Sequence, residues 1–164
     1  MDDLEIRRAE AGDLPALYAL LQAKAHFDGA AHALTASEAE FGAAIFRETP
    51  PCEFFVAESR AEAKGTLVGF AAFYPVFSTF AAKPGLWMDD LFVEERLRSR
   101  GIGRLLLAAL AEEASRRGCC KLEWSLQKSN ARGIAFYERE GAVVREENRF
   151  AKLDEAGIAR LLAS

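Results

Sequence analysis

Residues 98–103, Arg-Ser-Arg-Gly-Ile-Gly, join an apolar strand-like segment to a long amphipathic helix. The helix is predicted over residues 102–117, where apolar residues recur at the i, i+3, i+4, i+7 spacing of one face. Gly101 and Gly103 lack a Cβ, so the main chain can take a positive φ and approach phosphate oxygens closely. A strand, a glycine turn and a helix start in this order predict a pyrophosphate site for a nucleotide-like cofactor.

The charges around this turn support the same prediction. Arg98, Arg100 and Arg104 crowd the start of the helix, where each cation opposes the macrodipole by about 0.3–1 kcal/mol. A strongly anionic ligand would relieve the conflict, because it accepts hydrogen bonds from the N–H groups at a helix start. The alternative is that the glycines serve an ordinary turn and the arginines coat a solvated surface, since an isolated G-x-G is a weak motif.

Length, composition and charge limit the remaining classes. The chain has 164 residues, is 51% hydrophobic and carries a formal charge of -4, which predicts one domain over residues 1–164. No polybasic run suggests nucleic acid binding, and no apolar run reaches the ~20 residues of a membrane span. We therefore expect a cytoplasmic protein with no nucleic acid or membrane partner, whose mild acidity suits a cationic substrate.

The cysteines indicate neither disulfides nor a metal site. Cys52, Cys119 and Cys120 are odd in number, and none has a zinc-like spacing to His26 or His32. We interpret all three as small apolar residues and expect no metal. A Cys-His mechanism is not favoured, because no histidine lies near Cys119 and Cys120 in the sequence.

Short apolar strands alternate with helical stretches, which is typical of a mixed α/β domain. Strands are expected at residues 5–9, 52–59, 67–77, 86–93 and 121–126. Helices are expected at residues 13–25, 35–47, 102–117, 130–140 and 154–163.

Local signals mark several boundaries. Asp13 and Asn130 are predicted N-caps. The second helix has two possible capping boxes, Thr35 with Glu38 or Ser37 with Glu40. Residues 52–59 and 67–77 form a predicted hairpin, and residues 142–145 and 149–153 a closing one.

With these segments in place, the chain resembles the GNAT superfamily of acetyl-CoA-dependent N-acetyltransferases along nearly its whole length. The family's Gln/Arg-x-x-Gly-x-Gly/Ala turn is matched at residues 98–103, after the strand Asp-Asp-Leu-Phe-Val at 89–93. A second signature, Asn-x-x-x-x-x-Phe-Tyr-x-x-x-Gly-Ala, is matched at residues 130–142. The resemblance implies an α/β (α+β) fold with a central mixed sheet of about six to seven strands, flanked by helices, whose central strands splay apart.

Within the superfamily the chain looks most like the diamine acetyltransferases, the spermidine/spermine and thialysine group. The matching segments include residues 69–71, 89–93 and 135–137. The loop at residues 25–33 departs from the polyamine enzymes, which carry several acidic residues there, because this chain retains only Asp28. The implied function is direct transfer of acetyl from acetyl-CoA to a primary amine of a small molecule in a ternary complex.

The resemblance also assigns residues to the cofactor, with backbone groups of Leu91 and Val93 holding the pantetheine arm and a main-chain N–H near Phe92 or Val93 supporting the oxyanion. The expected cofactor-binding residues are Leu91, Phe92, Val93, Arg98, Ser99, Arg100, Gly101, Ile102, Gly103, Arg104, Asn130, Arg132 and Tyr137.

Two residues are predicted to carry the chemistry. An alkyl amine of pKa ~10.4 must lose a proton before it can attack, and the resemblance favours Asp89 for this step, through water. Tyr137 stays protonated at neutral pH and can supply a proton to the departing thiolate as general acid. The alternatives are that Asp89 and Asp90 pair with basic side chains and only shape the fold, and that Tyr137 is simply aromatic packing. Strand geometry lets only one of the two aspartates face a given cleft.

The substrate-binding residues are expected to be His26, Asp89, Asp90 and Glu147. A competing hypothesis is a non-catalytic acyl-CoA-binding sensor that uses the same phosphate site. An unrelated nucleotide-binding domain is disfavoured, because no Walker lysine follows Gly103. We also expect a homodimer, since the related acetyltransferases commonly pair and residues 73–80 are strongly aromatic.

Overall fold

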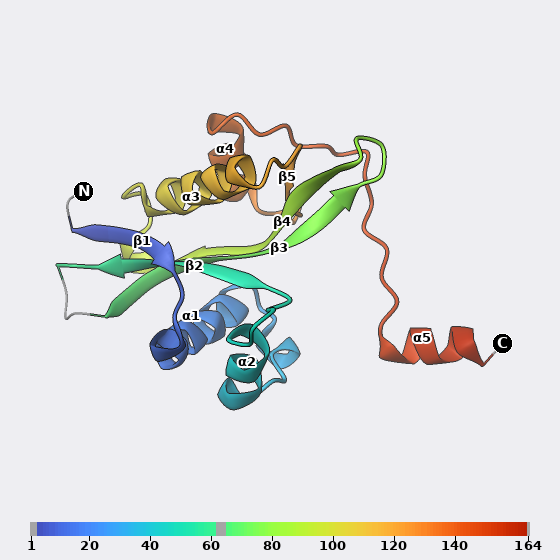
Figure 1. Cartoon of the computed structure of the whole chain (residues 1–164), viewed down its shortest axis with the longest axis horizontal. Coiled ribbons are helices and arrows are strands. Elements are labelled where there is room, and N and C mark those ends of the chain that lie inside the picture. Colours follow the sequence, from blue (N-terminus) through green and yellow to red (C-terminus); the bar gives the residue numbers. More distant parts are fainter. Residues whose placement is uncertain (1–2, 62–64, 164) are drawn as a thin grey trace. The chain divides into compact units, whose positions relative to one another are not determined.

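The computed structural model describes residues 3–61 and 65–163, and the chain divides into two compact units, residues 1–125 and 126–164. The first unit contains a mixed sheet (Figure 1). Its strands, in spatial order, are β1 (Leu4–Arg8), β2 (Glu53–Ser59), β3 (Thr66–Ser78), β4 (Lys83–Val93) and β5 (Leu122–Glu123). The α/β class and the five expected strands are thus confirmed, although β5 is shorter than residues 121–126.

The predicted count of six to seven strands is wrong, because the described residues form a sheet of five. The missing strands are those of the closing hairpin, since residues 142–145 and 149–153 have no strand structure. Both segments are mostly apolar, Ala-Val-Val-Arg at 142–145 and Arg-Phe-Ala-Lys-Leu at 149–153, and charged residues separate the two. A strand is stable only when a partner satisfies its backbone groups and an apolar face is buried. In these segments the apolar side chains of Val143, Phe150 and Leu153 are 84%, 79% and 57% exposed.

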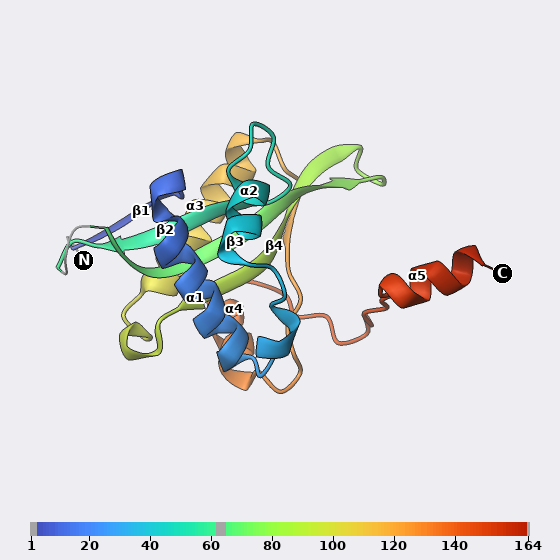
Figure 2. The same cartoon turned by 90° about the horizontal axis from the view of Figure 1, so that it is seen from below.

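Helices cover both faces of the sheet. Helices α1 (Leu14–Phe27) and α2 (Glu38–Ile45) lie on one face, and α3 (Ile102–Arg116) lies on the other (Figures 1 and 2). The core on the α1 face is aromatic and aliphatic, with Leu17, Val56 and Phe70 fully buried. It includes a chain of ring contacts from Phe92 through Phe70 to Phe54.

At two of the three predicted N-caps, the side chain makes a capping hydrogen bond. Ser37 accepts the Glu40 N–H, and the Glu40 carboxylate accepts the Ser37 N–H at 2.8 Å, which selects the second of the two capping boxes. Asn130 accepts the Gly133 N–H at 2.9 Å. Asp13 occupies the N-cap position of α1 as predicted, but its side chain makes no capping hydrogen bond to that helix. Its carboxylate instead accepts two hydrogen bonds from Arg7 at 2.6 and 2.8 Å, because an ion pair with a neighbouring strand competes with local capping.

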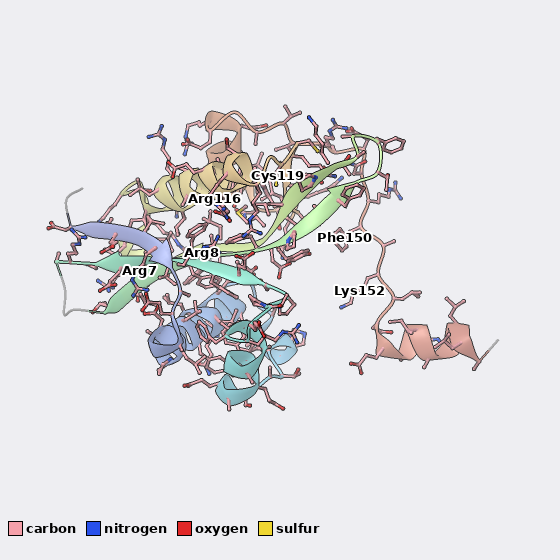
Figure 3. The ribbon with its side chains drawn as sticks, in the orientation of Figure 1. Arg7, Arg8, Arg116, Cys119, Phe150 and Lys152 are labelled. Carbon is pink, nitrogen blue, oxygen red and sulfur yellow. The ribbon has the colours of Figure 1, made fainter. Side chains whose placement is uncertain are left out.

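A cluster of charged side chains joins α3 to the edge of the sheet. The buried carboxylate of Glu113 is 7% exposed and lies 2.6 Å from guanidinium nitrogens of Arg8, Arg116 and Arg117. Figure 3 labels Arg8 on β1 and Arg116 on α3, both of which form ion pairs with Glu113. Glu53 on β2 also pairs with Arg8 and Arg117. These five residues are called the α3-side cluster below.

The second unit contains two helices among its described residues, α4 (Ala131–Arg139) and α5 (Glu155–Leu162). Gly141, with a φ of 90°, follows α4 in the left-handed conformation that glycine adopts most readily at a helix end. Asp154 caps α5 by accepting the Gly157 N–H at 2.7 Å. Both helices were predicted, and Asn130 and Gly141 bound α4 as expected.

Candidate active site

The predicted pyrophosphate turn has an unusual backbone. After β4 the chain forms a short 3-10 helix, η3 (Glu95–Leu97), and then passes through Ser99 with a φ of 64° and Gly101 with a φ of 84°. The left-handed region is costly for serine, by about 1 kcal/mol or more, and such residues persist mainly at functional sites. Gly101 is the N-cap of α3 and carries no side chain that could cap it. The N–H groups of Ile102 and Gly103 therefore point out of the helix end.

The arginines of the turn do not share one environment. Arg100 and Arg104 are exposed, as expected for groups that could meet an anion. Arg98 is half-buried, and its Nε donates a hydrogen bond of 3.0 Å to the Val93 carbonyl oxygen. Arg100 and Ile102 also help to line a pocket of about 410 Å³, whose further lining residues, within the described part of the chain, include Leu4 of β1 and Ser59 of β2 and none from β4. The turn thus presents its main chain and Arg100 at the surface, while Arg98 is bound within the protein.

The edge of β4 beside the turn extends beyond its partner strand. Pairing with β5 is parallel and is limited to Leu86 with Leu122 and Trp87 with Glu123, whereas β4 continues to Val93. This is the geometry expected of splayed central strands. A Cβ at Gly69 of β3 would lie 2.7 Å from the Phe92 carbonyl oxygen, so Phe92 directs its main chain toward β3.

Strand alternation then fixes the direction of the neighbouring backbone groups. Since successive residues direct their main-chain groups to opposite edges, those of Leu91 and Val93 face away from β3. This is the orientation that binding of a pantetheine arm along β4 would require. The Val93 carbonyl oxygen also accepts the hydrogen bond from Arg98, which agrees with its outward direction.

Asp89 occupies a β-bulge. Asp90 pairs with Ala72 and Met88 pairs with Phe73, so Asp89 is the additional residue between two register positions. A bulge re-aims the side chain it carries, and bulges are frequent next to active sites. The Asp89 side chain is exposed, and its charge contributes to the raised pKa values of Cys52 and Tyr74. Asp89 therefore lies near both of these residues.

Asp90 has a different environment, because its carboxylate is 2.6 Å from the Lys24 ammonium of α1. Lys24 also pairs with Asp28, one helical turn later, at 2.5 Å. Burial raises the pKa of Asp90, and Lys24 counteracts this only in part. Burial alone would lower the pKa of Lys24, but the hydrogen bonds to Asp28 and Asp90 outweigh it, so that pKa is raised.

Lys24, Asp28, Asp89 and Asp90 are called the α1-side cluster below. Asp90 is thus paired with a basic side chain, which leaves its predicted role in substrate binding a prediction. The exposed Asp89 is the aspartate available to a ligand.

The cysteines here are poor nucleophiles. Burial raises the pKa of Cys52 to about 12, with further contributions from the charges of Asp89, Asp90 and Glu53. Burial also raises the pKa of Cys119. Since the thiolate is the reactive form, both residues stay protonated near neutral pH. Cys52 nevertheless borders Asp89, which the sequence analysis did not anticipate.

The other predicted site residues have simpler surroundings. His26 is exposed in the last turn of α1. In the second unit, Arg132 and Glu147 are exposed, and Glu147 lies outside any regular element. The Tyr137 ring meets the Phe136 ring edge-on at 4.9 Å, and the Tyr137 carbonyl accepts the Ala142 N–H at 3.0 Å.

Lys24, Phe27, Cys52 and Tyr74 were missed by sequence reasoning. For Lys24, two signals were available: its i, i+4 spacing to Asp28 on one helix face and its place in a segment that resembles the diamine acetyltransferases.

The sequence of this chain matches a known protein family. The model of the acetyltransferase (GNAT) family matches residues 14–142. The chain belongs to this family. It therefore shares the family's acetyl-transferring character, and enzymes of the family use acetyl-CoA as co-substrate.

Among curated relatives, an L-ornithine N5-acetyltransferase of Arabidopsis thaliana is 39% identical over 87 residues, which cover 53% of this chain and 38% of that protein. The chain thus matches less than half the length of that relative. A thialysine N-epsilon-acetyltransferase of Mus musculus is 27% identical over 146 residues, or 87% of this chain and 85% of the relative.

Solved structures agree on the fold. An integron cassette protein from the mobile metagenome of V. cholerae superposes with a TM-score of 0.79 at 24% identity, covering 99% of both chains. An aminoglycoside acetyltransferase from an uncultured soil metagenomic sample superposes with a TM-score of 0.76 at 19% identity, covering 93% of this chain and 98% of that one.

Two further observations concern metals and membranes. Among residues 3–61 and 65–163, no group of three or more His, Cys, Asp or Glu side chains is arranged to hold a metal ion. Within the same described ranges, no helix combines the length and the apolar character that crossing a membrane requires.

Proposed function

We propose that this protein transfers the acetyl group of acetyl-CoA directly to a primary amine of a small cationic molecule in a ternary complex. The observation that carries the proposal is the bulged, exposed Asp89 on a strand whose edge extends past its parallel partner. The glycine turn that begins α3 lies at the end of the same strand. One strand thus links a candidate base to a candidate diphosphate site.

The cofactor side of the site uses mainly backbone groups. The amides at the start of α3 would bind the diphosphate, with help from the exposed Arg100 and Arg104. The outward main-chain groups of Leu91 and Val93 would hold the pantetheine arm. Asn130 fixes the start of α4, and we assign Arg132 of that helix to the cofactor as well. When bound, acetyl-CoA supplies the activated thioester.

The chemical step requires one base and one acid. Asp89 would accept a proton from the acceptor ammonium through a water molecule, because an alkyl amine is almost fully protonated near neutral pH. The freed amine would attack the thioester carbonyl, so that the C–N bond forms and the C–S bond breaks. Tyr137 would give its phenolic proton to the leaving thiolate, and the proton that the nitrogen loses on becoming an amide would return through water to the Tyr137 phenolate. The main-chain N–H of Val93, which faces away from β3, would stabilise the oxyanion, whereas that of Phe92 is turned toward β3. Cys52 takes no part in this scheme.

The charge of the α1-side cluster indicates the acceptor class. Its three carboxylates and one ammonium carry a formal charge of -2. A cationic acceptor would supply the missing positive charge, and diamines, polyamines and lysine analogues all meet this requirement. The named activities of the relatives, on ornithine and thialysine, fall in the same chemical class. We assign His26 and Glu147 to the acceptor side.

The proposal is tested with the full chain, acetyl-CoA and a panel of putrescine, spermidine, ornithine, a lysine analogue and an aminoglycoside. Thiol release and the mass of the acetylated product are measured together. We expect release with at least one cationic amine and none with a neutral alcohol of similar size. Tight binding of acetyl-CoA without release on any amine would favour the non-catalytic sensor.

We further propose that the protein is a homodimer and that it works in the cytoplasm, where thiols such as its free Cys52, Cys119 and Cys120 stay reduced. The β3–β4 hairpin supports the dimer, because Phe77 and Phe80 near its tip are 63% and 104% exposed. Burial of two such rings against a second copy would bring a large apolar gain. Light scattering should give the mass of a dimer and, for F77S/F80S, that of a monomer. A monomeric wild type would refute the dimer.

A further inference from the structure

Arg98 lies in the turn before α3, but its side chain contacts α1 and β4. The guanidinium carbon is 4.1 Å from the centre of the Phe27 ring and 5.6 Å from that of Phe92. Its Nε donates a hydrogen bond of 3.0 Å to the Val93 carbonyl oxygen. The Arg98 guanidinium therefore contacts Phe27, Phe92 and the Val93 carbonyl group, all of which lie outside the turn at residues 98–103.

Phe27 is the last residue of α1 and is 58% exposed. Its ring centre is 6.4 Å from that of Phe92, so its main partners on the protein side are Arg98 and Phe92. Three residues earlier, Lys24 reaches Asp90 of β4. The end of α1 is thus attached near the end of β4 by two different interactions, a cation–π contact and an ion pair.

We propose that Arg98 is a positioning residue, which fixes the last turn of α1 beside the acceptor site, and that its side chain is not a ligand of the diphosphate. The consequence for acceptor binding rests on the proposed function. The residues fixed in this way are Lys24 and Asp28 of the α1-side cluster and the predicted acceptor ligand His26. The backbone amides of the turn remain directed out of α3, so the two roles are divided between the main chain and the side chain of one turn.

The test compares R98A, F27L, the double variant and F27W in the full chain. Three quantities are measured: the KM for a cationic acceptor, the Kd of acetyl-CoA by calorimetry, and the amide hydrogen exchange of residues 24–28. A partly exposed cation–π contact corresponds to a change of about fivefold. We expect R98A and F27L each to raise the acceptor KM and the exchange rate by about this factor, with the Kd of acetyl-CoA within about twofold of wild type.

Two further comparisons separate positioning from a general loss of structure. The double variant should be no worse than R98A, because both changes remove the same contact. F27W, which retains an aromatic face, should keep the wild-type KM.

Additive effects in the double variant would overturn the proposal. So would an R98A variant whose Kd for acetyl-CoA rises tenfold or more while F27L leaves α1 exchange unchanged, because Arg98 would then bind phosphate. If no amine is acetylated, the proposed function fails, but the exchange and acetyl-CoA measurements still decide the role of Arg98.

Discussion

The two charged clusters on opposite faces of the sheet differ in their balance of charge. The α3-side cluster has three arginines and two glutamates, and its buried Glu113 has a pKa lowered to about 2, chiefly by hydrogen bonds to Arg116 and Arg117 that outweigh burial. The α1-side cluster has three aspartates and one lysine, and burial raises the pKa of Asp90. In the α3-side cluster, the arginines neutralise the charge of Glu113. The α1-side cluster keeps an excess of negative charge, which is typical of a site that a cation completes.

D89N removes the proposed base of the α1-side cluster. Asparagine has nearly the same size as aspartate but cannot accept the proton of the acceptor, so we expect kcat to fall about a thousandfold. The Kd of acetyl-CoA and the free energy of unfolding should stay near wild type. D28N is the matched control, because Asp28 belongs to the same cluster but pairs with Lys24. Equal losses in D28N and D89N would show that only the total charge matters.

In the α3-side cluster, we expect a substitution to reduce stability and to leave substrate binding nearly unchanged. E113A leaves Arg8, Arg116 and Arg117 without their shared carboxylate, and we expect it to lower the free energy of unfolding by about 3 kcal/mol. Urea denaturation measures this loss. The KM values for both substrates should change little in the folded variant. A stable E113A enzyme with a raised acceptor KM would reverse the roles assigned to the two clusters.

Glu113 also predicts a pH dependence of stability. Its pKa is about 2 in the folded chain, against the ordinary value of 4.5 in the unfolded chain. The unfolded state therefore binds a proton first as the pH falls. Its stabilisation, about 3 kcal/mol, is fully present above pH ~4.5 and is lost between there and pH ~2. Denaturation of wild type and E113Q in this window should converge at low pH, and parallel curves would contradict the assignment.

Local signals predicted much of the fold and part of the site. The Ser37–Glu40 capping box, the Asn130 cap and the glycine turn depend on neighbouring residues, and the structure contains each of them. Asp13 lies at the predicted N-cap position, but it makes no capping hydrogen bond to α1, because Arg7 of the adjacent strand binds its carboxylate. The closing hairpin failed because short apolar runs do not reveal whether a partner strand exists.

The site residues also divide into those that neighbouring sequence predicts and those that depend on how distant elements pack. Residues 89–103 form one continuous segment of sequence, so a motif could identify them. The contacts of Lys24 with Asp90 and of Phe27 with Arg98 join residues more than sixty positions apart. Neither the spacing nor the composition of one sequence contains that information, because such pairs depend on how α1 packs on the sheet. The different roles of Asp89 and Asp90 likewise follow from the bulge and from Lys24.

Y137F tests whether the α1-side cluster acts alone. Phenylalanine keeps the ring but cannot donate a proton to the thiolate, so we expect kcat to fall about a hundredfold. The Kd of acetyl-CoA should stay within a few-fold of wild type. Y74F is the control, because Tyr74 is a phenol whose pKa is raised by burial and by Asp89. If Y74F loses activity and Y137F does not, the acid has been assigned to the wrong tyrosine.

The negative charge of the α1-side cluster should also influence which acceptor the enzyme prefers. K24M removes the ammonium between Asp28 and Asp90 and changes the formal charge of the cluster from -2 to -3. An acceptor with two cationic groups should then gain over a monoamine by about fivefold in kcat/KM, and the gain should shrink as salt screens the charges. The ratio of the two acceptors is the measure, because loss of the ion pair also loosens α1. K24R keeps the charge and should keep the ratio. If K24M leaves it unchanged at low salt, Lys24 serves only to anchor α1, and the excess charge of this face does not select the acceptor.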